Sequence, residues 1–150
     1  MPRNSWSIPI GPLVEKHKGN IKQAVREVAM EAFARVIMKT PVDTGRLRAN
    51  WMVSEGSINT TQVDATDPAG SGAVDAMRSA VQSLPVEKTI YLSNSLPYAS
   101  VVEYGLYPNP PKGGAGKTEG GFSKQAPAGM VRVTAQEIEG IFSEAVSKLK

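Results

Sequence analysis

The sequence has no cysteine and a single histidine among its 150 residues. Without cysteine, disulfide bonds and thiolate metal sites are excluded. His17 lies between Lys16 and Lys18, and two neighbouring ammonium groups disfavour both a bound cation and a protonated imidazole. We therefore expect a surface histidine, and a catalytic triad that needs an imidazole has no other to use.

Long hydrophobic runs are also missing. No run approaches the roughly 18 apolar residues of a membrane helix. The segment before residue 20 lacks the apolar core of a signal peptide. We therefore expect no contact with a membrane. The net charge of +3 is too small to indicate nucleic-acid binding by itself, because such binding needs the charge gathered on one face.

The chain has enough hydrophobic residues for one folded domain. Hydrophobic residues make up 41% of the sequence, and the 14 glycines and 11 prolines are concentrated in a few stretches that mark loops. In residues 1–16, Trp6, Ile8 and Ile10 alternate with Ser7 and Pro9. This pattern predicts an extended N-terminal arm, which lies either on its own domain or on a neighbouring subunit. Residues 17–150 are then a single α+β domain.

Apolar periodicity predicts two long helices and two shorter helical segments. Residues 21–39 repeat apolar side chains at steps of three and four, with Asn20 as the N-cap. A final helix is expected from about residue 127 to the end, with a possible capping box at Thr134–Glu137. Residues 71–84 predict a minor helix, and residues 98–104 predict one or two helical turns that end at Gly105.

Alternating patterns predict about three strands between the long helices, at 47–53, 57–66 and 88–94. The first of these would place Arg46 and Arg48 together on one strand face. The predicted fold is therefore α+β: two long flanking helices packed on a small, mainly antiparallel sheet, with a minor helix and a long flexible loop rich in Gly, Pro and Lys at 106–125.

That loop contains KGGAGKT at residues 112–118, which ends like a phosphate-binding loop. The full pattern requires a glycine five residues before Gly116, where this chain has Pro111. Prolines precede the segment and Glu119-Gly120-Gly121 follows it, so neither a buried strand nor a helix flanks it. We interpret it as a loop whose three lysines, Lys112, Lys117 and Lys124, could contact a partner protein or phosphates.

The carboxylates form no recognisable catalytic or metal-binding pattern. Asp64 and Asp67 match no calcium loop. Glu103 lies between apolar neighbours, and we expect a structural ion pair with Arg46 or Arg48 rather than a general base. The sequence predicts no enzyme and no cofactor. A small basic DNA-binding protein of phage or bacterial origin is the alternative, because the arginine face and the loop lysines could touch DNA.

Two motifs in a fixed order resemble a known family. PVDTGRLR at residues 41–48 follows the first amphipathic helix, and the strand IYLSN at 90–94 runs into PYASVVEYG at 97–105. Both are similar to landmarks of the HK97 gp10-like family of tailed-phage proteins, and the likeness covers most of residues 20–150. The chain departs from the family where "PxPFLRPA" usually precedes the last helix, since it has QAPAGM at 125–130. The motif residues that we expect to be structural are Asp43, Thr44, Gly45, Tyr98, Glu103 and Gly105.

The resemblance implies a non-enzymatic virion protein. Members of this family are tail-completion or neck components that finish a long tail and join it to the head. It implies a homo-oligomeric ring, usually a hexamer, with the tail terminator or tail tube and the head–tail connector as neighbours. Such a protein resides in the host cytoplasm during assembly and in the tail or neck of the virion. We expect Arg46, Arg48, Lys112, Lys117 and Lys124 to face a neighbouring subunit or the packaged DNA.

Overall fold

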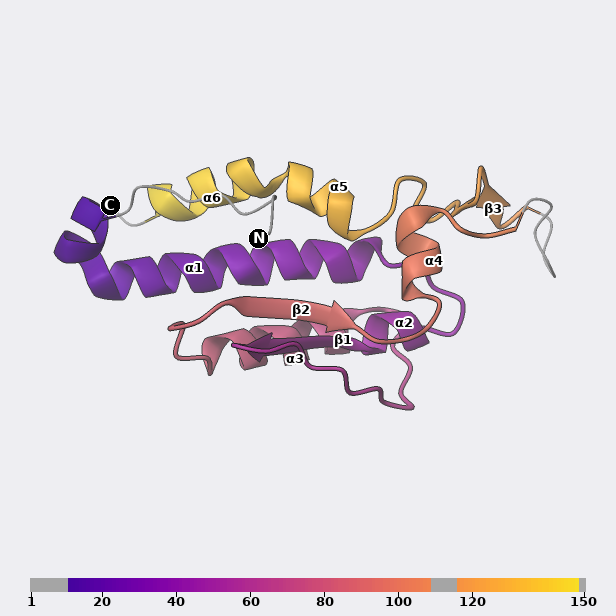
Figure 1. The fold of residues 1–150 in the computed structure, drawn as a ribbon, viewed down its shortest axis with the longest axis horizontal. Coiled ribbons are helices and arrows are strands. Elements are labelled where there is room, and N and C mark those ends of the chain that lie inside the picture. Colours follow the sequence, from indigo (N-terminus) through magenta and orange to yellow (C-terminus); the bar gives the residue numbers. More distant parts are fainter. Residues whose placement is uncertain (1–10, 109–115, 149–150) are drawn as a thin grey trace.

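A single long helix organises the structure. The computed structural model describes residues 11–108 and 116–148, with side chains described from residue 21. Helix α1 (Gly11–Lys39) has α6 (Ile138–Ser147) on one side and a two-stranded sheet on the other (Figure 1). The mixture of helices and small antiparallel sheets confirms the predicted α+β class.

Helix α1 begins earlier than its sequence pattern predicts. The expected extended arm at 1–16 is wrong for residues 11–16, which are helical, and residues 1–10 lie outside the described part. The proposed N-cap Asn20 is inside the helix. The physical reason is the position of Pro12: in the first helical turn no residue needs its N–H for an internal bond, so proline starts the helix instead of preventing it.

The main sheet pairs β1 (Trp51–Glu55) with β2 (Ile90–Asn94) in antiparallel register, so that Trp51 is opposite Asn94. The predicted strand at 88–94 is confirmed. The strand at 47–53 is only half right, because residues 46–49 form the helical turn α2 (Arg46–Ala49). The strand predicted at 57–66 is wrong. The buried amide of Asn50 bonds both the N–H and the carbonyl of Val63, which places this segment as a loop.

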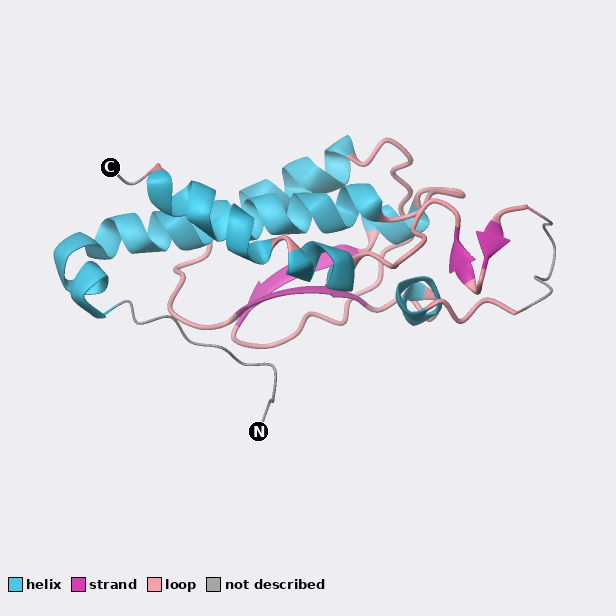
Figure 2. Cartoon of the chain, turned by 90° about the horizontal axis from the view of Figure 1, so that it is seen from above, coloured by secondary structure: helices cyan, strands magenta, loops and turns pink. Residues whose placement is uncertain are grey.

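The remaining elements follow the sequence pattern with one exception. Helix α3 (Ser71–Gln82) and the short α4 (Ala99–Tyr104), which ends at a left-handed Gly105, confirm the predictions. A small hairpin, β3 (Thr118–Glu119) with β4 (Phe122–Ser123), lies at one end of the molecule, beyond the main sheet (Figure 2).

The exception is the C-terminal helix, which is divided into α5 (Val131–Gln136) and α6 at Glu137. It therefore starts later than the predicted residue 127. The capping box is also wrong, since the Thr134 hydroxyl donates to the Met130 carbonyl. The carboxylate of Glu137 instead binds Arg35 and Lys39 of α1, both at 2.8 Å. An ion pair with a distant helix replaces the local cap.

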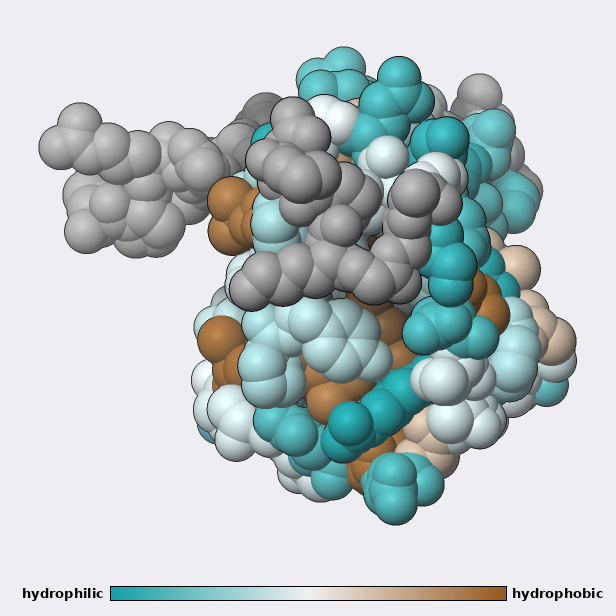
Figure 3. All heavy atoms as spheres, turned by 90° about the vertical axis from the view of Figure 1, so that its right-hand side faces the viewer, coloured by the Kyte–Doolittle hydropathy of each residue, from teal (hydrophilic) through white to brown (hydrophobic). Residues whose placement is uncertain are grey.

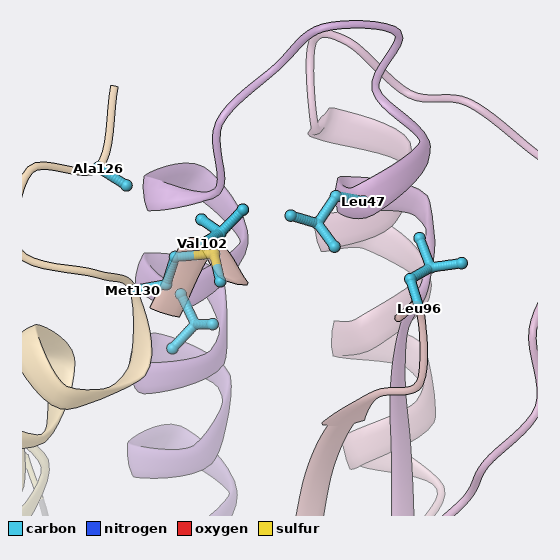
Figure 4. Packing of buried hydrophobic residues seen from close by; sticks show 6 residues of the cluster. Leu47, Leu96, Val102, Ala126 and Met130 are labelled. Carbon is cyan, nitrogen blue, oxygen red and sulfur yellow. The ribbon is translucent and has the colours of Figure 1, made fainter. Parts of the chain in front are cut away.

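Two hydrophobic clusters form the core. The first joins α1 to the C-terminal half and is shown in Figure 4; its buried members are Val36, Leu47, Leu96, Val102, Ala126 and Met130. The second packs α1 against α3, and its buried members are Ala29, Met30, Ile37, Met77 and Val81. The Trp51 side chain packs against both clusters. Its indole N–H donates to the Thr40 hydroxyl at 2.9 Å, so β1 is tied to the end of α1.

The turn at Gly45 gives a direct test of this architecture. Gly45 has φ +89°, and an added Cβ would lie 2.5 Å from the carbonyl carbon of Asp67. Gly45→Ala is expected to lower the free energy of unfolding by about 3 kcal/mol, from backbone strain and overlap. Gly140→Ala in α6 is the control. Nothing lies within 4 Å of its added Cβ, and a helical Gly→Ala change stabilises by up to ~1 kcal/mol. Urea unfolding measures both, and equal stabilities would contradict the role of this turn.

Candidate assembly surface

The first motif forms the turn between α1 and α2. The Thr44 hydroxyl accepts the Arg46 N–H at 3.3 Å, and Gly45 packs against the Asp67–Pro68 backbone, where the Asp67 N–H donates to the Gly45 carbonyl at 3.0 Å. The Asp43 carboxylate points outward, 3.9 Å from the ammonium group of Lys117. The motif thus fixes the backbone and brings the loop lysine beside Asp43.

Arg46 and Arg48 do not share a strand face, because both lie in the helical turn α2. The guanidinium of Arg48 donates to three carbonyls, those of Met38 and Thr40 at 2.9 Å and of Pro68 at 2.7 Å. This side chain therefore satisfies carbonyls at the end of α1 that the helix leaves without partners. Arg46 is exposed. Contact of either arginine with a neighbour or with DNA stays a prediction.

The second motif places a buried carboxylate at the start of α5. Glu103 is 7% exposed and accepts the backbone N–H groups of Met130, Val131 and Arg132 at 2.7–2.9 Å. Its ion-pair partner is Arg132, at 3.1 Å, and not Arg46 or Arg48 as predicted. A guanidinium N–H of Arg132 also donates to the Glu103 carbonyl. Glu103 therefore neutralises the free donors of a helix end, which is a structural role.

These contacts determine the protonation of Glu103. Burial by itself would raise the pKa of this carboxyl. The N–H groups of Arg132, Val131 and Met130 and the Arg132 side chain favour the ionised form more strongly, and the pKa is lowered below its ordinary value. The carboxylate is thus held charged inside the fold, where a general base would need the opposite shift toward neutral pH.

Gly105 lets the hairpin pack tightly against α4. It has φ +68°, and an added Cβ would lie 2.6 Å from ring carbons of Phe122. The Tyr107 N–H donates to the Gly121 carbonyl at 3.0 Å, which attaches the β3–β4 hairpin to the chain that leaves α4. Burial, the largest cause, raises the pKa of the Tyr107 phenol. Phe122 and Gly121 had no signal in the sequence, because they lie in what looked like an unstructured loop.

Gln125 was missed for the same reason. Its amide oxygen accepts the Val42 N–H at 2.8 Å and its amide nitrogen donates to the Val42 carbonyl at 2.9 Å. This pair of bonds connects the segment before α5 to the first motif. QAPAGM, the segment that departs from the family pattern, therefore supplies both this connection and the buried side chains of Ala126 and Met130.

These contacts bring both motifs to one end of the molecule, which we call the hairpin end: the turn at 43–46, α4 with residues 105–107, and the β3–β4 hairpin. Hydrophobic side chains reach the surface there among hydrophilic ones (Figure 3). Tyr98, Tyr104 and Leu106 are 37%, 58% and 60% exposed. The Arg132 guanidinium lies 5.0 Å from the centre of the Tyr104 ring. Lys117 and Lys124 are exposed nearby, and Lys112 lies outside the described residues.

The second candidate surface is an apolar groove of about 470 Å³, which runs between α1, the start of β2 and α6. We call it the α1–β2–α6 groove, and its apolar lining includes Val25, Ala29, Phe33, Ile90, Ile138 and Phe142. Lys88 is the one charged residue among its lining residues in the described part of the chain. A surface of this composition suits an apolar protein segment better than a charged ligand.

Comparison with known proteins agrees with this arrangement. The model of the HK97-gp10-like family, described as "Bacteriophage HK97-gp10, putative tail-component", matches residues 13–105. The chain belongs to this family. No curated protein and no solved structure matches it. The matched region ends at Gly105, so the hairpin, α5 and α6 lie beyond it.

As a member of the HK97-gp10-like family, the protein is a structural tail component of a bacteriophage and is associated with the virion. Within residues 11–108 and 116–148, no three His, Cys, Asp or Glu side chains are grouped to hold a metal ion. In the same part of the chain, no helix has both the length and the hydrophobicity to cross a membrane. The surfaces of the molecule are the candidate sites for the function of a structural tail component.

The buried Glu103 carboxylate makes stability depend on pH. Its folded-state pKa is lowered, so its contribution is fully present above the unfolded pKa of about 4.3 and is lost as the pH falls through the folded value. Glu103→Gln is expected to lower the free energy of unfolding by about 3 kcal/mol at pH 7, because the amide cannot accept all these donors. The difference from wild type should shrink between about pH 5 and pH 3.

Thermal unfolding across this pH range measures the effect. Glu139→Gln, which removes an exposed carboxylate of α6, controls for the loss of one negative charge. Parallel stability curves for wild type and Glu103→Gln would contradict the assignment.

Proposed function

We propose that this tail component is a ring-forming tail-completion or neck protein, which helps to finish the tail and join it to the head. Membership of the HK97-gp10-like family carries the proposal, because it makes the chain a structural part of the tail. The surfaces described above support the finer role. A subunit of a ring needs two different contact patches, since each copy meets one neighbour with one patch and the next neighbour with the other.

The hairpin end and the α1–β2–α6 groove are two such patches. The hairpin end combines the exposed Tyr98 and Tyr104 with Arg132, and aromatic residues and arginine are enriched at protein interfaces. The groove is apolar and open. They lie on different elements, so each can meet a different neighbouring copy. The tail terminator or tail tube and the head–tail connector are the proposed further neighbours of the ring. We propose a hexameric ring, because the family resemblance implies that number of subunits.

Packaged DNA is a further candidate neighbour. Arg46, Lys117 and Lys124 are exposed at the hairpin end, and non-specific contact with phosphates needs only exposed cations. The alternative of a dedicated DNA-binding protein depended on Arg46 and Arg48 forming one basic strand face. Arg48 is instead bonded to three carbonyls of its own chain, and no observation favours the alternative.

The experiment that tests the role is electron microscopy of particles from a host infected with a phage that lacks this gene. We expect DNA-filled heads beside separate, otherwise complete tails. Normal joined virions would overturn the neck role while leaving the family membership intact. A DNA-binding protein would instead bind duplex with an affinity that falls steeply with salt.

The hairpin end can be tested by a single charge. Leu106→Glu places a carboxylate on this surface and is expected to abolish complementation of the deletion phage, because an interface would bury it without a partner. Ile58→Glu is the matched control. Ile58 is 58% exposed and Leu106 is 60% exposed, but Ile58 lies in the loop after β1. Both proteins should show wild-type melting temperatures. Full complementation by Leu106→Glu would exclude the hairpin end as an essential contact.

A further inference from the structure

The outer edge of β2 has backbone groups ready for another strand. Within the described residues, β2 pairs with β1 alone. The Gly56 N–H donates to the Thr89 carbonyl at 2.8 Å, so the alternate residues Thr89, Tyr91 and Ser93 bond β1. It follows that Ile90, Leu92 and Asn94 direct their N–H and C=O groups to the other edge. Unpaired edges of this kind bind additional strands readily.

The same three residues face the core side of the sheet. Ile90 lines the α1–β2–α6 groove, and Leu92 packs against the first hydrophobic cluster. A strand added beside β2 would therefore lie along the open side of the groove. Its side chains on one face would enter the groove, and those on the other face would point to solvent.

The N-terminal segment has the pattern that this site requires. Trp6, Ile8 and Ile10 alternate with Ser7 and Pro9. In a strand, residues two apart share both a side-chain face and the direction of their N–H groups. Pro9 has no N–H, so it is tolerated only where that position points away from the sheet. When the Pro9 position points away from the sheet in this way, Trp6, Ile8 and Ile10 direct their N–H and C=O groups to β2.

Strand direction then follows from geometry. In an antiparallel ladder, residues that exchange both backbone bonds lie directly opposite each other, with side chains on the same face. Ile10, Ile8 and Trp6 would then lie opposite Ile90, Leu92 and Asn94, with their side chains on the side of the sheet that carries the groove. In a parallel pairing in which the same residues bond β2, the side chains of Trp6, Ile8 and Ile10 would point to the outer face of the sheet. Only the antiparallel arrangement satisfies Pro9 and buries the apolar side chains together.

The short link to α1 keeps Ile8 and Ile10 away from the groove residues of their own α1. Ile10 is bonded to Gly11, the first residue of α1, so its Cα is about 3.8 Å from that of Gly11, and Ile8 reaches about 10 Å. Val25, the nearest groove residue of α1, lies about 21 Å along a straight helix from Gly11. The first turns of α1 are angled to the rest (Figure 1), but even a right-angle bend leaves about 15 Å.

We propose that residues 5–10 of one copy add as an antiparallel strand to the outer edge of β2 in a neighbouring copy, with Trp6, Ile8 and Ile10 on the side of the sheet that carries the α1–β2–α6 groove. The inference rests on the proposed ring and identifies one of its contacts. The added strand bonds the free edge and covers the groove in a single step. Each subunit gives its segment to one neighbour and receives the segment of the other, which is the connection that a closed ring needs.

The test uses the phage particle, where the copies are assembled. The chain has no cysteine, so Ile8→Cys/Val25→Cys carries the only two thiols of the protein. We expect a short bis-maleimide to link these copies in purified particles into a ladder of covalent multimers on a denaturing gel. Cross-linked monomers without a ladder would mean that the segment binds its own chain, and would overturn the proposal. No cross-link in particles that contain the protein would overturn it too.

Proline substitutions test which residues of the added strand donate their N–H groups to β2. In the double-cysteine protein with Val25→Cys and Ile10→Cys as the pair, Ser7→Pro is expected to leave the ladder within about twofold of its parent. Ile8→Pro removes an N–H that bonds β2 and an apolar side chain, and should reduce the ladder at least about tenfold. Ile8→Ala, which keeps the N–H, should lie between them. Equal effects at positions 7 and 8 would rule out the strand.

These outcomes separate the two proposals. If the protein is absent from joined particles, the proposed function fails and the inference fails with it. If the protein is present in fixed amount but forms no ladder, the neck role stands and only this contact is wrong.

Discussion

The carboxylate of Glu103 connects the two halves of the chain, and much of the molecule depends on it. It belongs to α4, the last element within the part of the chain that the family model matches, and it accepts the first backbone donors of α5, which lies beyond that part. These bonds place Met130 in the first hydrophobic cluster. They also orient α5 so that Glu137, at its end, reaches Arg35 and Lys39 of α1. Because α6 follows directly, the wall of the groove formed by Ile138 and Phe142 depends on the same contact.

The sequence was informative where the signal is local. Helices α3 and α4 and strand β2 agree with apolar period and turn chemistry, because a proline or a glycine ends each segment where the backbone requires it. The errors occur where a distant partner decides. Asn50 takes the backbone of Val63 out of any ladder, and Glu137 exchanges a local cap for cations of α1 that lie about 100 positions away. No window of neighbouring residues contains that information.

The candidate surfaces show the same limit. Glu103 was expected to pair with an arginine of the first motif, and the pairing goes to Arg132, 29 positions later. Arg48 was expected on an open face, and three carbonyls surround its guanidinium. Both residues carry the family resemblance, and both hold the fold together from inside. The motifs therefore identify the architecture, whereas most residues of the proposed contact surfaces, such as Leu106, Val25 and Phe142, lie outside them.

A two-stranded sheet next to an open apolar groove is a marginal arrangement for a free protein. Two strands bury little surface by themselves, and a bare strand edge invites pairing with any extended chain. Here the β1–β2 sheet is stable because α1 and α3 cover one face and Trp51 anchors it to both clusters. Among residues 11–108 and 116–148, nothing pairs with the outer edge of β2, which is where we propose that an intermolecular strand adds. In the proposed strand exchange, the subunit folds before it assembles, and a neighbouring copy supplies the last strand of its sheet. The added strand would contribute main-chain hydrogen bonds and apolar burial together. Because Pro9 has no N–H, the segment can bond β2 only through the backbone groups of Trp6, Ile8 and Ile10.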